Sequence, residues 1–205
     1  MTIIAQTNQA IIHEAVVKIQ DNDDEEYEAE INALCRLHHV PGIVKIFGSY
    51  EVDNSGCIVM EHVHGESFLD IINDHDYTTD ELLVLYDRLV EVVKAMHAAG
   101  VVHGDLKPDN VMVRPNGEVV IIDFGHSIVE VTADTPDPGY DIGTAEYVPP
   151  EGSAAGLGLF KCDLYSMGVI LYDVLMRRDY QEGDPLPDND RIRRLMSRDP
   201  ERREF

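Results

Sequence analysis

The 205-residue sequence is poor in basic side chains. It has 16 lysines and arginines against 39 acidic residues, which gives a formal net charge of −23 at pH 7. Such a chain repels the phosphates of nucleic acids and of anionic lipids, so we expect neither nucleic-acid binding nor membrane-surface binding. A charged partner is expected to be basic. An acidic surface is also typical of proteins in salt-rich surroundings, and both interpretations stay open.

Cysteines and long apolar runs are also scarce. Cys35, Cys57 and Cys162 form an odd set whose spacing matches no zinc or redox motif. We expect buried thiols rather than disulfides, in a reducing, cytoplasmic compartment, which includes a host cell that makes or receives the protein. No stretch approaches ~18 consecutive apolar residues, so we expect no membrane span. The opening stretch, MTIIAQTNQAIIHE, does not have the pattern of a signal peptide.

The first third of the chain predicts a small sheet with one helix. Residues 15–19, AVVKI, are mostly β-branched and predict a strand. Residues 21–37 begin with acidic side chains and continue with apolar ones on one face, which predicts a helix. Residues 42–51 and 56–63 predict two further strands joined by a tight turn.

Two long helices are expected after this sheet. Residues 79–99 carry leucine, valine and methionine at helical spacing, and we expect Thr79 to cap the start and Gly100 to end the helix. Residues 161–178, KCDLYSMGVILYDVLMRR, are apolar on nearly every side, which is typical of a buried helix.

A hairpin and a long loop separate the two helices. Residues 110–113 and 118–123 predict short paired strands, and residues 126–160 are rich in Gly, Pro, Asp and Thr. Strands with one helix come first, and helices with a hairpin follow, which indicates an α+β fold with two lobes. We place a reduced N-terminal lobe at residues 1–63 and a mostly helical C-terminal lobe at residues 64–205.

Polar residues crowd between apolar runs at residues 101–110, VVHGDLKPDN. Asp105 is suited to accept a hydroxyl proton, and Lys107 to steady a transferring phosphoryl group. Asn110 and Asp123 lie at the ends of neighbouring hairpin strands, and their oxygens can hold Mg²⁺. This pattern predicts an apparatus for phosphoryl transfer, although Asp105 alone would also suit a turn cap.

A lysine lies inside the first predicted strand. Lys18 in a β-branched strand is often an edge residue that extends to solvent. An inward lysine instead needs a carboxylate partner, and Glu30 on the apolar face of the following helix can supply it. We favour the ion pair between Lys18 and Glu30.

Several motifs occur in a fixed order from about residue 15 to residue 203. They are AVVK, EINALCRLHHVPGIVKI, HGDLKPDN, DFG, GTAEYVPPE, DLYSMGVILYDVL and DPERR. DFG alone is a weak signal, but the ordered set resembles the eukaryotic-type protein kinases of the Ser/Thr class. The resemblance implies the two-lobed kinase fold, ATP and Mg²⁺ as cofactors, and a protein substrate.

The resemblance also implies how the nucleotide is held. The adenine would bond to the backbone at Glu61 and Val63, and Val16 and Met112 would lie on its two faces. The phosphates would meet Lys18.

Further roles come from the same resemblance. Asp105 would be the catalytic base, with Thr144 bonded to both Asp105 and Lys107, as in kinases that act on serine and threonine. Arg203 would pair with Glu151.

His103 is expected to be a packed residue rather than a base, because Val102 and Gly104 flank it. The resemblance implies that His103 stacks with Phe124, Leu34 and Ile46 in a column that bridges the lobes.

Three departures from the kinase pattern favour a reduced form. Residues 1–41 contain no glycine, so the glycine-rich phosphate lid is missing, and at most one of the two usual strands fits before Ala15. Gly104 replaces the arginine that normally meets a phosphorylated activation loop. Few residues follow the second long helix, which indicates that outer helices of the C-terminal lobe are short or absent.

Three functions stay open. The first is an active minimal Ser/Thr kinase that prefers substrates with basic residues around the acceptor. The second is a kinase-like binding module that docks on or inhibits other kinases, and an activating partner could supply the missing lid. The third, which we rank last, is an atypical small kinase with an HGDL loop, because such proteins usually lack the GTAEYVPPE segment that is present here.

Overall fold

The computed structural model describes residues 14–21, 25–53, 55–136, 143–152, 156–177, 180–181 and 183–205. The strand expected before Ala15 lies outside these ranges. Among the described residues, no helix combines the length and apolar character that a membrane crossing requires. Cys57 is buried as predicted, but the prediction is wrong for Cys35, which is exposed, and for Cys162, which is partly buried.

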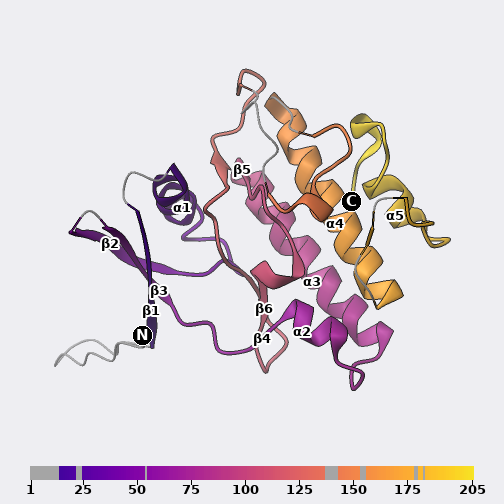
Figure 1. Ribbon diagram of the computed structural model, residues 1–205, viewed down its shortest axis with the longest axis horizontal. Coiled ribbons are helices and arrows are strands. Elements are labelled where there is room, and N and C mark those ends of the chain that lie inside the picture. Colours follow the sequence, from indigo (N-terminus) through magenta and orange to yellow (C-terminus); the bar gives the residue numbers. More distant parts are fainter. Residues whose placement is uncertain are drawn as a thin grey trace.

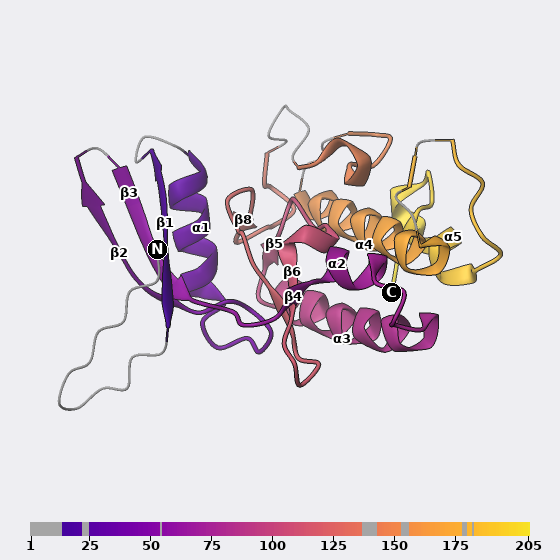
Figure 2. The same cartoon turned by 60° about the horizontal axis from the view of Figure 1, so that its bottom comes forward.

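A three-stranded antiparallel sheet forms the first lobe (Figure 1). Its strands are β1 (Ala15–Asp21), β2 (Ile46–Val52) and β3 (Ser55–Glu61), in the order β1-β3-β2. Helix α1 (Glu25–Arg36) lies beside this sheet, on the side that faces the second lobe (Figure 2). The first turn of α1 is acidic, which suits the partial positive charge of a helix N-terminus.

Helices dominate the second lobe. They are α2 (Phe68–Asn73), α3 (Thr79–Ala98), α4 (Leu159–Met176) and α5 (Asp190–Leu195). Helices α3 and α4 run side by side, and the Tyr86 hydroxyl donates a hydrogen bond of 2.9 Å to the Met167 carbonyl (Figure 1). Helix α4 is buried along most of its length, as its apolar composition predicted.

The start of α3 corrects one detail of the sequence interpretation. Thr78, not Thr79, is the N-cap: its hydroxyl accepts a bond from the Glu81 backbone N–H, and the Glu81 carboxylate accepts one from the Thr78 N–H. This reciprocal pair is a capping box, and it depends on the offset of three residues to Glu81. Gly100 follows the helix with φ +77°, as expected of a helix-ending glycine.

Short strands form two further small sheets. The predicted hairpin is present as β6 (Val111–Val113) and β7 (Val119–Ile121), and β4 (Glu66–Ser67) adds a third strand. Strands β5 (Val101–Val102) and β8 (Ile128–Val129) form a separate pair. We did not predict α2, β4, β5 or β8, because none of them exceeds six residues and their pairing is decided by tertiary contacts.

One apolar cluster extends from α1 and the first sheet to α3 and α4. The α+β, two-lobed architecture is therefore as predicted. The chain crosses between the lobes in the segment from Glu61, the last residue of β3, to Glu66, the first of β4. We call residues 62–65 the hinge. The division into units at residues 63 and 64 stays a prediction.

Candidate active site

An ion-paired triad lies where the two lobes meet. Lys18, from the middle of β1, places its Nζ 2.7 Å from Glu30 Oε2 and 2.7 Å from Asp123 Oδ1. Glu30 comes from α1 and is fully buried. The predicted pairing of Lys18 with Glu30 is therefore present, and Asp123 joins it from the second lobe.

The triad keeps its lysine charged. Burial alone would lower the pKa of Lys18, but hydrogen bonds to Asp123 and Glu30 outweigh burial and raise it. Burial would raise the pKa of Asp123, yet the hydrogen bond from Lys18 holds that pKa below its ordinary value. For Glu30, burial prevails and raises the pKa, although Lys18 opposes the change. The most exposed carboxylate of the triad, Asp123, is thus ionised and available to a cation.

Asp123 adopts an unusual backbone conformation. Its φ of +61° lies in the left-handed region, which aspartate tolerates better than most residues. Asn110 lies nearby, because the Ile122 N–H donates a 2.9 Å hydrogen bond to the Asn110 carbonyl. Strained residues of this kind concentrate at functional sites.

A second cluster surrounds Asp105. Thr144 donates to Asp105 Oδ1 from its backbone N–H at 2.7 Å and from its hydroxyl at 2.8 Å. Lys107 Nζ lies 2.8 Å from Asp105 Oδ2 and 2.7 Å from Thr144 Oγ1, and Asn110 Nδ2 lies 3.2 Å from Asp105 Oδ2. The bonds of Thr144 to Asp105 and Lys107 are those that the sequence comparison with kinases predicted.

These four donors use the acceptor capacity of the Asp105 carboxylate, which has about four lone-pair sites. Burial alone would raise the pKa of Asp105, but the bonds from Lys107 and Thr144 outweigh burial and lower it. Asp105 is therefore an ionised, oriented carboxylate.

The donor set fits a hard divalent cation. Asn110 directs its amide nitrogen to the Asp105 backbone carbonyl at 2.9 Å, so its amide oxygen is left for another partner. That oxygen and the Asp123 carboxylate are the oxygen ligands that Mg²⁺ prefers. The fit rests on the chemistry of these two side chains.

His103 is packed, as expected. Its ring lies 4.8 Å from the Phe124 ring, Nδ1 accepts a bond from the Asp105 N–H, and Nε2 lies 3.2 Å from the Ile122 carbonyl. Burial lowers the pKa of His103, so the ring is neutral and both nitrogens are engaged. Leu34 belongs to the same core as Phe124, and Ile46 packs against that core. The contact of His103 with Phe124 is therefore present, and the complete column stays a prediction.

Asp163 is the functional residue that the sequence interpretation missed. It lies near the start of α4 with 1% of its surface exposed, and it accepts hydrogen bonds from the N–H groups of His103 (2.9 Å) and Gly104 (3.1 Å). His97 Nε2 lies 2.7 Å from the same carboxylate. Asp163 thus fixes the backbone that carries Asp105. An acid in a mostly apolar helix was the available signal, since a buried charge needs partners, but α4 also carries a second buried acid, Asp173.

A cleft of about 340 Å³ opens beside the triad. Its walls contain every residue predicted to hold the nucleotide, together with Asp123: Val16, Lys18, Glu30, Glu61, Val63 and Met112. The lining also contains Val44, Met60, His62 and Ile122. Asp105, Lys107 and Asn110 are not in its lining.

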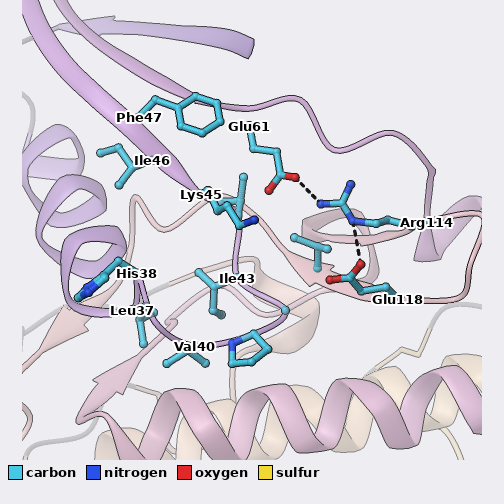
Figure 3. A pocket seen from close by; sticks show the side chains of 14 residues that line it. Leu37, His38, Val40, Ile43, Lys45, Ile46, Phe47, Glu61, Arg114 and Glu118 are labelled. Carbon is cyan, nitrogen blue, oxygen red and sulfur yellow. Dashed lines mark hydrogen bonds and ion pairs between the residues drawn. The ribbon is translucent and has the colours of Figure 1, made fainter. Parts of the chain in front are cut away.

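A second cavity, of about 440 Å³, lies between the segment from α1 to β2 and the side chains of Arg114 and Glu118 (Figure 3). Glu61 borders both cavities, and Figure 3 shows its carboxylate directed at Arg114, 2.6 Å away. Arg114 also lies 3.3 Å from Glu118. The Glu61 side chain is thus engaged outside the first cleft. Its backbone N–H donates a 2.8 Å hydrogen bond to the Lys45 carbonyl, and the adenine contact at the Glu61 backbone stays a prediction.

Arg203 and Glu151 form the predicted ion pair. Arg203 is fully buried, its Nη2 lies 2.8 Å from Glu151 Oε2, and its Nη1 also contacts this carboxylate. The guanidinium lies over the Tyr165 ring, 5.0 Å from its centroid. This pair connects the end of the described chain to the segment that follows Thr144.

Comparison with known proteins agrees with this geometry. Residues 4–199 match the family model of the protein kinase domain. A probable serine/threonine-protein kinase of Corynebacterium efficiens is 31% identical over 196 residues, which cover 89% of this chain and 30% of that protein. The serine/threonine-protein kinase pkn2 of Myxococcus xanthus is 34% identical over 171 residues, which cover 80% of this chain and 20% of that protein. PknA of Mycobacterium tuberculosis is 30% identical over 166 residues, 78% of this chain and 38% of that protein.

The chain therefore spans between a fifth and two fifths of the length of these relatives. Members of the matched family use ATP and a divalent metal in general and act on proteins. The family match covers nearly the whole chain, and the site brings together Lys18, Glu30, Asp105, Asn110 and Asp123 in the order and setting of the motifs. This chain belongs to the protein kinase family.

Proposed function

We propose that the chain is a minimal Ser/Thr protein kinase, which transfers the γ-phosphate of ATP to serine or threonine hydroxyls of proteins. The observation that carries the proposal is the presence of two intact clusters in one molecule. Lys18, Glu30 and Asp123 line the cleft, and Asp105 with Lys107 forms the second cluster.

ATP would occupy the 340 Å³ cleft. Val16 and Met112 would hold the adenine between them, and the backbone at Glu61 and Val63 would bond to its edge. These side chains all line the cleft, which supports the assignment. Lys18 would then meet the phosphates.

Mg²⁺ would be held by the oxygens of Asn110 and Asp123. The ion supplies charge neutralisation for the phosphates when bound. Lys18 lies 2.7 Å from Asp123, so the cation and the lysine would contact the same carboxylate. With the Asp123 charge shared in this way, Lys18 would remain paired with Glu30 and could also contact the phosphates of the nucleotide.

Asp105 would accept the proton of the substrate hydroxyl, and Lys107 would steady the transferring group. The contact of Thr144 with both residues supports serine and threonine as acceptors, because the matching contact is the one expected of Ser/Thr kinases.

The substrate is expected to be basic around the acceptor. Asp109 is exposed, and together with Glu146 it borders a cavity of about 180 Å³ next to the segment that follows Thr144. Glu66, a second acid that we propose to border the substrate groove, is also exposed. These charges and the net charge of −23 favour cationic peptides and disfavour nucleic acid. We also propose a cytoplasmic location, which the thiols of Cys35 and Cys57 suit.

The test is phosphate transfer by the purified full chain with Mg²⁺ and radiolabelled ATP. We expect transfer to mixed basic Ser/Thr peptides, and at least a hundredfold loss in Asp123→Ala. Asp76→Ala, which removes an exposed acid far from the cleft, should act like the wild type. Equal activity of both variants would refute the assigned role of Asp123.

A second candidate is a kinase-like module that docks on or inhibits another kinase. The absence of glycine from residues 1–41 favours it, because glycine-rich lids donate backbone N–H groups to the phosphates. If the wild type transfers no phosphate to any peptide or protein while it remains folded, this second function replaces the first.

A further inference from the structure

Three potential metal ligands gather where β1 meets the hinge. Glu14 directly precedes β1, and His62 and His64 lie in the hinge. Glu14 Oε2 lies 3.2 Å from His62 Nδ1 and 2.7 Å from His64 Nε2. One ligand atom from each residue lies within 4.8 Å of those of the other two.

The backbone brings these side chains together. The His62 N–H donates a 3.1 Å hydrogen bond to the Glu14 carbonyl, which continues the pairing of Ala15 with Glu61. His62 and His64 are two residues apart, so they share one side of an extended segment. Their ring centroids are 4.4 Å apart.

The donor set suits a transition metal rather than Mg²⁺. Two imidazole nitrogens and one carboxylate oxygen are the ligands of many three-residue zinc sites, whereas Mg²⁺ prefers oxygen alone. Ligands about 2.0–2.2 Å from a tetrahedral Zn²⁺ lie roughly 3.3 Å from one another. The separation of 3.2 Å between Glu14 Oε2 and His62 Nδ1 is close to that value. The 2.7 Å between Glu14 Oε2 and His64 Nε2 is a hydrogen-bond distance, which would lengthen by about half an ångström around an ion.

An ion can reach this cluster. The side chains of Glu14, His62 and His64 are 41%, 39% and 61% exposed, so the ligands are accessible without an opening of the fold. His62 also lines the 340 Å³ cleft. The cluster therefore lies at the rim of the proposed nucleotide site but shares none of its assigned residues.

We propose that Glu14, His62 and His64 bind one Zn²⁺ ion, or a similar divalent transition metal, at the hinge. Three protein ligands leave the fourth tetrahedral position to water or to an incoming donor. The ion would connect Glu14, which directly precedes β1, to the hinge, where the described residues already form a backbone hydrogen bond between His62 and Glu14. This site is independent of the proposed kinase activity.

The test is calorimetric titration of the metal-stripped full chain with Zn²⁺, in excess Mg²⁺ so that sites made of oxygen ligands are filled. We expect one ion per chain. His64→Gln and Glu14→Gln should each weaken binding at least tenfold, because loss of a ligand should cost no less than loss of a residue that only supports one. Zn²⁺ should raise the melting temperature of the wild type but not of His64→Gln.

The control is a second histidine pair. His38 and His39 have ring centroids 5.1 Å apart, and the described residues place no third ligand with them in such a cluster. The double variant His38→Gln/His39→Gln should bind Zn²⁺ as the wild type does. Absorption of bound Co²⁺ should report a four-coordinate ion. Failure of the wild type to bind, or equal binding in the Glu14 and His64 variants, overturns the proposal.

Discussion

Lys18 pairs with two carboxylates at once. Its Nζ lies 2.7 Å from both Glu30 and Asp123, and these acids come from different lobes. An ammonium in this position can act both on the phosphates of a nucleotide and on the relative placement of the lobes.

We therefore expect Lys18→Met to weaken Mg²⁺-ATP binding by about 10- to 100-fold, which corresponds to the loss of about 1.5–3 kcal/mol from a charged hydrogen bond. Calorimetry measures the affinity. The control is Lys45→Met, because Lys45 is exposed and lines the other cavity (Figure 3). We also expect the wild-type affinity to be weak, since residues 1–41 offer no glycine-rich lid. Tight binding that survives Lys18→Met would contradict both expectations.

Gly143 allows the segment before Thr144 to touch the catalytic loop. A Cβ at this position would lie 2.4 Å from the Gly104 carbonyl oxygen and 3.1 Å from Asp105 Oδ1, and φ is +98°. Gly143→Ala should push Thr144 away from Asp105 and lower phosphate transfer at least tenfold, with the fold retained.

The matched control for that variant is Gly48→Ala. Nothing lies within 4 Å of a Cβ there, and φ is not in the left-handed region. Transfer rates of the two variants, with circular dichroism as a check on folding, decide the question. Equal rates would mean that the close approach at Gly143 is not needed.

Residue types and their order predicted most of the residues of this site, but not the residues that hold its loop in place. Lys18, Asp105, Asn110 and Asp123 stand in motifs that a reader can recognise. Asp163 contacts the loop from a position 60 residues along the chain, and only the fold shows that its carboxylate meets the His103 N–H.

At the scale of elements, the sequence predicted the bodies of the helices better than their ends. Apolar spacing predicted α3 and α4 well, because burial of one face or of all faces leaves a periodic pattern. The first turn was harder, since Thr78 and Thr79 are equally good caps by residue type. Glu81 decides for Thr78 because it lies three residues after it.

Thr78→Ala should lower the free energy of unfolding by about 1 kcal/mol, a typical cost of losing an N-cap. Thr79→Ala is the control and should change stability much less. Urea unfolding of both variants measures the difference. Equal destabilisation would show that the capping box is not formed in solution.

The same cap has a pH dependence. Hydrogen bonds from the Thr78 backbone and side chain hold the pKa of Glu81 below its ordinary value. A lowered folded-state pKa gives a contribution that is complete above the unfolded-state pKa, about 4.3, and is lost as the pH falls through the folded-state pKa. The difference between wild type and Thr78→Ala should therefore shrink below about pH 4.

At the scale of the whole molecule, the main feature is the net charge of −23. Composition predicts that the chain does not bind polyanions such as nucleic acids, but it could not show where the acidic side chains lie. The structure places Asp109 and Glu146 on one cavity beside the segment that carries Thr144. Sequence could not bring these two residues together, since the fold alone joins the catalytic loop to that segment.

We expect a basic Ser/Thr peptide to be preferred over an acidic one, with a gain of roughly 0.5–1 kcal/mol for each exposed charge pair. The preference should weaken with salt, because the screening length falls from about 10 Å at 0.1 M to about 3 Å at 1 M. A peptide array at both salt concentrations measures it. The double variant Asp109→Asn/Glu146→Gln should lose part of the preference, whereas Asp76→Asn should not. Equal use of acidic and basic peptides at low salt would contradict the assignment.

The carboxylate of Asp105 has no vacant acceptor position, because Thr144, Lys107 and Asn110 supply four donors. A substrate hydroxyl that approaches Asp105 must therefore take the place of a resident donor. Thr144 supplies two of the four, and its segment also carries the close contact at Gly143. In the proposed function the incoming alcohol would compete with these donors for Asp105, and the affinity for a peptide would include the cost of displacing one of them.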